Sequence, residues 1–182
     1  LLSGGSLGLA LREPGPLTLA VVFHGVDRRF DLTTVDCLWA GTRLQGGGTF
    51  RLDDDGGAGL ALAFANGISF DGGYRPGGFD GKVRLRAVEL ATLLPGLASG
   101  QVEGELEVAD GVFAPRLAWN IAVRDGSFDG VPFSVRTSAL FRDNGARQIR
   151  GQARYGEMEL TVRDGWWYGT ERGQEFRLDS QL

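Results

Sequence analysis

Residues 117–126 carry the clearest structural signal in this chain and read Leu-Ala-Trp-Asn-Ile-Ala-Val-Arg-Asp-Gly. Large apolar side chains occupy every second position, and the residues between them would point to the opposite face of an extended strand. The closing Asp125-Gly126 pair is typical of a tight turn, because glycine adopts positive φ freely and aspartate tolerates it. The stretch therefore predicts a β-strand with one apolar face that leads into a turn.

The same alternation recurs on both sides of this stretch. Asp-Gly, Asn-Gly and Gly-Gly pairs separate the alternating runs by roughly 8–20 residues, a spacing typical of antiparallel strands joined by hairpins. We therefore predict an all-β fold with ten or more mostly antiparallel strands in an up-and-down order. The other alternating runs lie at residues 17–23, 60–64, 106–108, 133–141 and 158–162.

Residues 85–96 break the alternation and read Leu-Arg-Ala-Val-Glu-Leu-Ala-Thr-Leu-Leu-Pro-Gly. Leu90, Leu93 and Leu94 follow the i, i+3, i+4 spacing of a helix, and Pro95-Gly96 would end it. The segment predicts one short helix near residues 87–94. On either side of it, residues 1-86 and 98-182 form two weakly similar halves of what we expect to be a single domain over 1-182.

The composition excludes several classes of protein. Glycine accounts for 30 of the 182 residues, well above the usual ~7%, but it lacks the strict three-residue period of collagen. An aromatic content of 10% argues against disorder, and the many glycines argue against a coiled coil. A formal net charge of −4 argues against a general nucleic-acid binder, so we predict no nucleic-acid partner.

Enzymatic chemistry has little support in the sequence. His24 is the only histidine and is interpreted as an ordinary strand-end residue, with a catalytic or ligand role as the alternative. Cys37, the only cysteine, fits a small buried apolar residue better than a nucleophile. The Asp-Asp-Asp-Gly-Gly stretch at 53–57 favours a solvated hairpin turn, with a calcium site as the alternative. We predict no catalytic residue, no cofactor and no metal site.

Two local clusters have more than one interpretation. In an extended strand Trp166 and Tyr168 would share one face and Trp167 would point to the other. The cluster is either a patch that faces a lipid or a partner, or a stacked pair that closes the end of the core. Glu103, Glu105 and Glu107 form an acidic stripe that we interpret as solvated.

Residues 88–165 contain a recognisable order of motifs. Leu-Leu-Pro-Gly-Leu at 93–97 is followed by Gly-Gln-Val-Glu-Gly-Glu-Leu-Glu-Val at 100–108 and Ala-Pro-Arg-Leu at 114–117. A glycine-rich turn, Asp-Gly-Ser-Phe-Asp-Gly-Val-Pro-Phe, then occupies 125–133. This order resembles the repeat unit of the AsmA-like proteins, specifically the TamB (translocation and assembly module) family. Val112-Phe113 stands where that family often has a glycine before Ala-Pro.

The resemblance covers a little under half of the chain and carries several expectations. It implies a long, strongly curved sheet rolled into a U-shaped, taco-like hydrophobic groove in a protein of the bacterial cell envelope. The implied function is non-enzymatic: phospholipid transport between inner and outer membranes, outer-membrane protein assembly, or both. The implied partners are phospholipid acyl chains or nascent outer-membrane β-strands, and an outer-membrane barrel of the Omp85 type. The implied location is the periplasm, with an inner-membrane anchor in a segment outside this chain.

The alternating runs of the second half supply the candidate groove residues. The alternative function is a β-sandwich adhesin or carbohydrate-binding module, in which Trp167 would belong to an aromatic sugar platform. The predicted lipid-groove residues are Leu106, Val108, Leu117, Trp119, Ile121, Val123, Phe133, Val135, Phe141, Met158, Leu160 and Val162.

Overall fold

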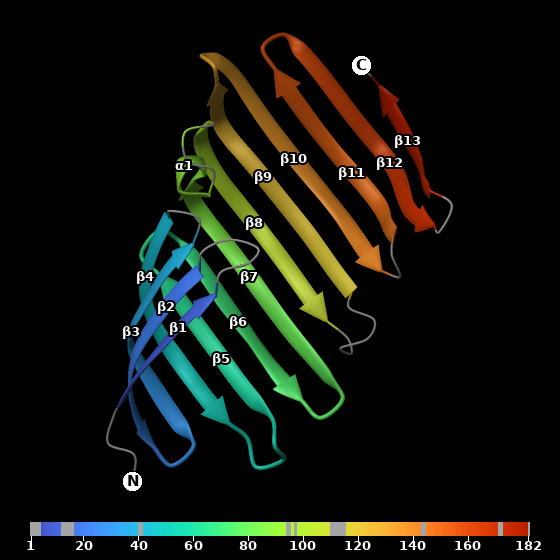
Figure 1. The fold of residues 1–182 in the computed structure, drawn as a ribbon. Helices are drawn as coiled ribbons and strands as arrows, with labels where there is room; N and C mark the ends of the chain where they lie inside the picture. The colour runs from blue at the N-terminus through green and yellow to red at the C-terminus, as the bar shows by residue number, and fades with distance from the viewer. Residues whose placement is uncertain are drawn as a thin grey trace. The chain divides into compact units, whose positions relative to one another are not determined.

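The computed structural model describes residues 5–11, 17–39, 42–93, 96, 98–109, 116–142, 145–170 and 173–181, and these form strands and one short helix (Figure 1). In chain order the elements are β1 (Gly5–Leu11), β2 (Leu17–Val26), β3 (Arg29–Trp39), β4 (Thr42–Leu52), β5 (Ala58–Phe64), β6 (Ile68–Arg75), β7 (Gly78–Glu89), α1 (Leu90–Leu93), β8 (Ser99–Ala109), β9 (Arg116–Phe128), β10 (Val131–Arg142), β11 (Gly145–Tyr155), β12 (Met158–Thr170) and β13 (Gly173–Gln181).

The strands form one sheet in which spatial order follows chain order from β1 to β13. Pairing is antiparallel from β1 to β6 and from β8 to β13. Among the described residues the two end strands, β1 and β13, do not pair with each other, so the sheet is not closed. The prediction of an all-β fold with mostly antiparallel strands and one short helix is confirmed, and the strands do not divide into the two sheets of a sandwich.

The helix is shorter than predicted. Residues 87–89 continue β7, and α1 contains only Leu90–Leu93, while Leu94 and Pro95 lie outside the described residues. Val88 in this stretch is fully buried, and Ala87 has a positive φ of 50°, which a right-handed helix does not tolerate, so the helix does not begin at residue 87. Leu90 is buried, and α1 packs against β8. Burial of Val88 therefore overrides the helical spacing of the leucines.

The chain divides into two compact units, Leu1–Val83 and Arg84–Leu182, which we call the N-terminal and C-terminal units. The division falls within β7, ahead of the helix at which the sequence placed the boundary between halves 1-86 and 98-182.

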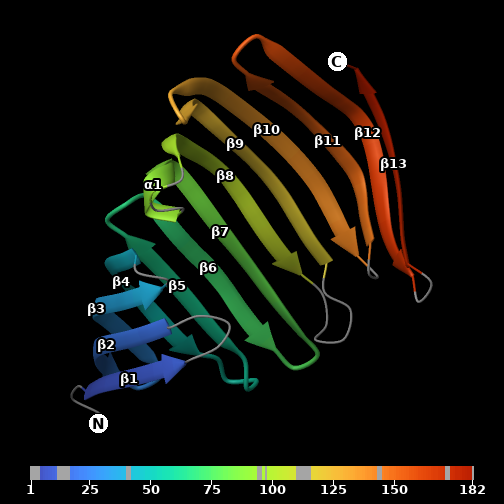
Figure 2. The same cartoon turned by 45° about the horizontal axis from the view of Figure 1, so that its top comes forward.

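The sheet of the N-terminal unit bends sharply. Figure 2 shows β1–β3 running at a steep angle to β5 and β6. Two glycines of β4 allow this bend. A Cβ atom on Gly46 would lie 2.1 Å from the carbonyl oxygen of Ala63, and one on Gly48 would lie 2.0 Å from that of Ala61. No side chain fits between β4 and β5 at these positions, so glycine is required there.

In the C-terminal unit β8–β13 lie side by side as a regular ladder (Figures 1 and 2). Register shifts interrupt the ladder between β8 and β9, between β9 and β10, between β10 and β11 and between β12 and β13. Gly104 in β8 has a φ of 150°, and a Cβ atom there would lie 2.2 Å from the carbonyl oxygen of Asn120. Glycine thus permits a close backbone approach in this unit as well.

The closed core is small for a chain of this length. Only six apolar side chains are buried among the described residues, so most apolar side chains keep part of their surface in contact with solvent. The buried residues are Val35, Val88, Leu90, Val102, Ala139 and Ala146.

Candidate functional site

The register of the C-terminal unit brings all twelve predicted groove residues to one face of the sheet. Cross-strand partners share a face, so each row can be followed from strand to strand. One row starts with Leu106 in β8, which pairs with Trp119 in β9. Another runs from Val123 through Val135 in β10 to Ala153 in β11 and Leu160 in β12. The remaining predicted residues, Val108, Leu117, Ile121, Phe133, Phe141, Met158 and Val162, lie in parallel rows.

None of these twelve side chains is fully buried. Ten are half-buried, while Met158 and Leu160 are exposed. Within the described part of the C-terminal unit the only element besides the strands is α1, which has four residues. The described residues of this unit therefore form no second layer that could cover the face.

The C-terminal apolar face extends onto β13, a strand that contains none of the predicted groove residues. Phe176 pairs with Trp167, and Leu178 pairs with Gly165. Phe176 keeps 72% of its surface exposed, the largest value among the exposed large apolar residues. The signal was available in the sequence, because Phe176 and Leu178 follow the same alternation as the other strands.

The aromatic cluster of β12 divides between the two faces as predicted. Trp167 stacks on Phe141 with ring centroids 6.3 Å apart and planes inclined by 23°. Both residues pair with the buried Ala146 of the intervening strand, so a small side chain lies beneath the two rings. On the opposite face the Arg147 guanidinium lies 5.6 Å from the Tyr168 ring centroid and donates a hydrogen bond of 3.1 Å to its hydroxyl. The stacked-pair interpretation fits Trp167, whereas Trp166 is exposed on the opposite face.

The N-terminal unit contains an apolar hollow that is not predicted from the sequence. Its volume is about 340 Å³, and every residue that lines it is apolar. Four strands, β2 to β5, contribute to it, so it depends on the bend of this sheet. The lining residues are Val21, Phe23, Phe30, Leu32, Phe50, Leu52 and Leu60.

Three phenylalanines form one wall of this apolar hollow. Phe23 and Phe30 meet edge to face, with ring centroids 6.0 Å apart and planes inclined by 78°. Phe30 and Phe50 are 5.9 Å apart and tilted by 36°. Both separations lie in the range at which aromatic pairs attract one another beyond their burial. The hollow is therefore bounded by mutually packed rings.

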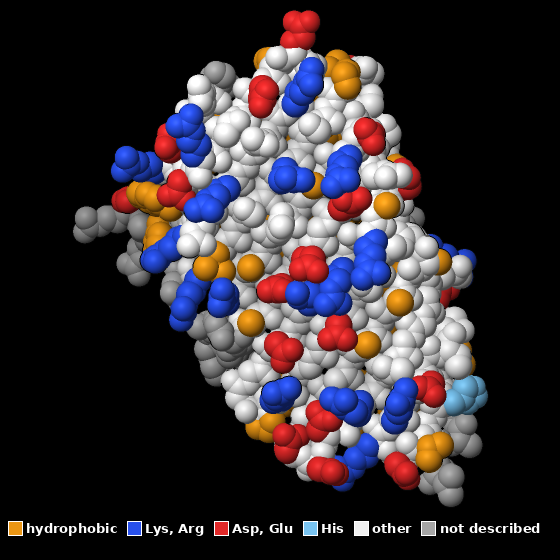
Figure 3. All heavy atoms as spheres, turned by 180° about the vertical axis from the view of Figure 1, so that it is seen from behind, with side chains coloured by type: hydrophobic (Ala, Val, Ile, Leu, Met, Phe, Trp, Pro, Cys, Tyr) orange, Lys and Arg blue, Asp and Glu red, His pale blue; other side chains and the backbone are white. Residues whose placement is uncertain are grey.

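The opposite face of the sheet is polar. The view from behind Figure 1 shows basic and acidic side chains scattered over the surface, with apolar side chains mostly standing singly (Figure 3). In the C-terminal unit the acidic stripe lies on this face and is ion-paired. Arg124 lies 3.1 Å from Glu103, and Arg84 lies 3.3 Å from Glu105. The sheet of the C-terminal unit therefore has one apolar and one charged surface.

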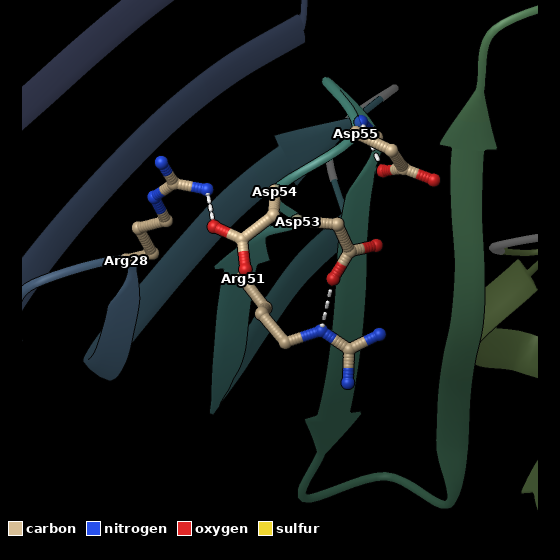
Figure 4. A network of polar contacts seen from close by, with 6 residues as sticks. Arg28, Arg51, Asp53, Asp54 and Asp55 are labelled. Atoms are coloured by element: carbon tan, nitrogen blue, oxygen red, sulfur yellow. Dashed lines mark hydrogen bonds and ion pairs between the residues drawn. The ribbon is translucent and has the colours of Figure 1, made fainter.

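The aspartate-rich stretch at 53–57 forms a turn in which each carboxylate has its own partner. Asp53 accepts a hydrogen bond of 2.7 Å from Nε of Arg51, and Asp54 forms an ion pair with Arg28. Asp55 accepts a hydrogen bond of 3.0 Å from the backbone N–H of Gly57. Figure 4 shows the three carboxylates pointing in different directions. Within the described ranges no group of three or more potential ligands could hold a metal ion, and this geometry favours the hairpin-turn interpretation.

The single cysteine and the single histidine, Cys37 and His24, lie in the neighbouring strands β3 and β2 of the N-terminal unit. Cys37 is half-buried in β3, and burial, assisted by the charge of Asp36, raises the pKa of its thiol. A raised pKa disfavours the thiolate, in keeping with a structural cysteine. His24 is exposed in β2 and pairs across the ladder with Asp31.

Comparison of the chain with protein-family models, with curated proteins and with solved structures gives no match. In the part of the chain that the structure describes, no helix combines the length and apolar character needed to cross a bilayer.

Proposed function

We propose that this protein is a non-enzymatic module of the bacterial cell envelope that binds phospholipid acyl chains along the apolar faces of its sheet. The observation that carries the proposal is the apolar face of the C-terminal unit, which is continuous over β8–β13 and only half-buried. An acyl chain laid on such a face gains about 0.8 kcal/mol for each CH₂ group removed from water.

The dimensions of the C-terminal apolar face support this ligand. Six strands spaced about 4.8 Å apart extend over roughly 24 Å across the sheet. One leaflet of a bilayer is about 15 Å thick in its hydrocarbon region, so an acyl chain fits within that width. The apolar hollow of the N-terminal unit offers a second apolar surface, bounded by aromatic rings.

The proposal includes the finer expectations that come from the resemblance to the TamB family. In this proposal the sheet forms a U-shaped groove in the periplasm that carries lipid between the membranes, or receives nascent outer-membrane strands, with an Omp85-type barrel as partner. The order of motifs at 88–165 supports this part.

Site-specific photo-crosslinking tests the proposal because adjacent residues of a strand point to opposite faces. A photo-reactive residue at Trp119 or Leu160 reports on the apolar face, and controls at Ala118 and Arg177, which lie on the polar face, report on that face. We expect lipid adducts at the first pair only, together with co-purified phospholipid in native mass spectra. Absence of lipid at all four positions, or equal labelling of both faces, would contradict the proposal.

A further inference from the structure

The polar face of the C-terminal unit carries a concentration of arginines that the proposed function does not use. Ladder pairing and the lining of two surface hollows place them on the face opposite the apolar one. The chain as a whole has a net charge of −4, so this local excess of positive charge runs against its composition. We call this set the arginine strip: Arg124 in β9, Arg136 in β10, Arg150 and Arg154 in β11, and Arg163 in β12.

Two hollows lie between the guanidinium groups of the arginine strip. One has a volume of about 420 Å³ and includes Arg124, Arg136 and Arg154 in its lining. The other has a volume of about 250 Å³ and includes Arg136, Arg150 and Arg163. Both hollows share Arg136 and Gln152. The short side chains of Ser134 in the first and Ser138 in the second leave space between the longer arginines.

The hollows of the arginine strip have a surplus of hydrogen-bond donors. Glu159 is the only carboxylate among their lining residues. Arg124 is partly used by its ion pair with Glu103, and Nε of Arg154 donates to the carbonyl oxygen of Gly156 at 3.1 Å.

Arg163 is also partly engaged, since it donates a hydrogen bond of 2.6 Å to Oε1 of Gln181. Arg136 and Arg150, by contrast, make no ion pair or side-chain hydrogen bond within the described ranges. Each guanidinium has five N–H donors, so the strip has unused capacity for an anion.

We propose that the arginine strip binds a ligand that carries two or more phosphate groups. Arginine forms bidentate hydrogen bonds with phosphate oxygens, and the neighbouring serine hydroxyls and the Gln152 amide supply further donors. Strands are about 4.8 Å apart and alternate residues about 6.7 Å apart, so one phosphate cannot span all five arginines. Two hollows that share Arg136 fit two phosphates side by side. The site lies on the polar face and is independent of acyl-chain binding.

The phosphates could belong to a soluble polyphosphate or to lipid headgroups at a membrane surface, and two arms of one experiment distinguish these sources. Calorimetric titration with tripolyphosphate at low ionic strength tests the soluble source. Flotation with phosphatidylglycerol vesicles, against phosphatidylcholine vesicles as the uncharged reference, tests the membrane surface. We expect binding in at least one arm, with an affinity that falls as salt is added.

The Arg136→Gln/Arg150→Gln variant removes the two unengaged arginines. Its matched control is Arg29→Gln/Arg75→Gln, which removes the same charge from exposed positions of the N-terminal unit. We expect the first variant to weaken binding by about ten-fold or more, because hydrogen bonds to charged groups are strong. The control should stay within about two-fold of the original chain, since distant exposed charges are screened.

Three results would overturn the proposal: no binding in either arm, unchanged binding by Arg136→Gln/Arg150→Gln, or an equal loss in the control. The crosslinks at Trp119 and Leu160 report on the opposite face. They should persist in the arginine variant, so failure of the phosphate site and failure of the acyl-chain site can be told apart.

Discussion

The β2–β3 hairpin of the N-terminal unit and the β9–β10 hairpin of the C-terminal unit share one structural device. In the first, Phe30 pairs with Gly25, and a Cβ atom on that glycine would lie 2.2 Å from the ring. In the second, Phe133 pairs with Gly126, and the corresponding distance is 2.7 Å. In both hairpins the ring following the turn covers the glycine that precedes it, which protects the backbone that the glycine would otherwise expose.

Beyond these hairpins the two units differ. The N-terminal unit draws Phe23, Phe30 and Phe50 together around the apolar hollow. In the C-terminal unit Phe141 and Trp167 stack over Ala146 within a longer apolar face. The same alternation of apolar residues therefore produces a tight hollow in one unit and an extended surface in the other. The outcome depends on where glycine and alanine allow neighbouring strands or aromatic rings to approach closely.

The largest expected effect comes from filling the space that permits the bend of the N-terminal unit. A Gly48→Val substitution places a branched side chain against the carbonyl oxygen of Ala61, which is backbone and cannot move away cheaply. We expect destabilisation of about 4 kcal/mol or more, confined to this unit. Hydrogen exchange measured on peptides of each unit should show lost protection in β2–β5 and retained protection in β9–β12.

The control for this prediction is Gly59→Ala in the neighbouring strand β5. A Cβ atom there would meet only the Arg51 side chain, at 3.6 Å, which is ordinary contact. We expect a change within about 0.5 kcal/mol. Equal destabilisation by both substitutions would show that β4 and β5 do not approach as closely as described.

The second prediction tests whether the two hairpins are equivalent. Phe30→Ala and Phe133→Ala each remove a half-buried ring from above a glycine, and each should cost about 2 kcal/mol, less than a fully buried phenylalanine. Urea denaturation followed by hydrogen exchange would assign each loss to its own unit. A much larger loss for Phe30 would mean that its contacts around the hollow outweigh the shared hairpin role.

Much of the fold is predictable from the sequence because strand alternation is a local property. Any stretch such as 117–123 reveals its own apolar face without reference to its neighbours. The start of the helix is not predictable in this way. Leucine spacing favours a helix from residue 87, whereas β7 extends to Glu89 because Val88 is buried by tertiary packing.

The candidate site is only partly predictable from the sequence, because some of its features depend on contacts between strands. The predicted groove residues of the C-terminal unit share a face because cross-strand pairing places partners on the same side of the sheet. The apolar hollow depends on the close approach of β4 and β5 at Gly46 and Gly48, which alternation does not encode. The arginine strip joins residues from four strands, and only their register places Arg124 and Arg163 at two hollows that share Arg136.

The third prediction concerns the two tryptophans of β12, which point to opposite faces. Trp167→Ala removes the stack on Phe141 and should cost about 1 kcal/mol more than Trp166→Ala, because Trp166 is 36% exposed and lies on the opposite face. A double-mutant cycle with Phe141→Ala measures the stacking directly. We expect a coupling of about 0.5–1.5 kcal/mol for Trp167. A coupling near zero would show that the two rings share the face without interacting.

The smallest expected effect is a pH dependence of stability that comes from the Asp36–Arg43 ion pair of the N-terminal unit. In the N-terminal unit, hydrogen bonds of 2.8 and 3.1 Å from Nε of Arg43 to Asp36, and the positive charge of Arg43, lower the pKa of that carboxyl against an opposing effect of burial. A lowered folded pKa gives a contribution to stability that is present above the unfolded pKa of about 3.9 and is lost as the pH falls through the folded value. Arg43→Gln should remove this contribution, so the gap between the original chain and the variant in urea midpoint should be widest near neutral pH and should close in acid. The exposed pair makes the gap small, and added salt should reduce it further.

The control is the same pH series on the Arg136→Gln variant. The gap in urea midpoint between the original chain and this variant should not close in acid, because Arg136 has no carboxylate partner among the described residues. A gap that stays constant from neutral to acid pH in Arg43→Gln would show that Arg43 stabilises β3 and β4 by packing and not by its charge.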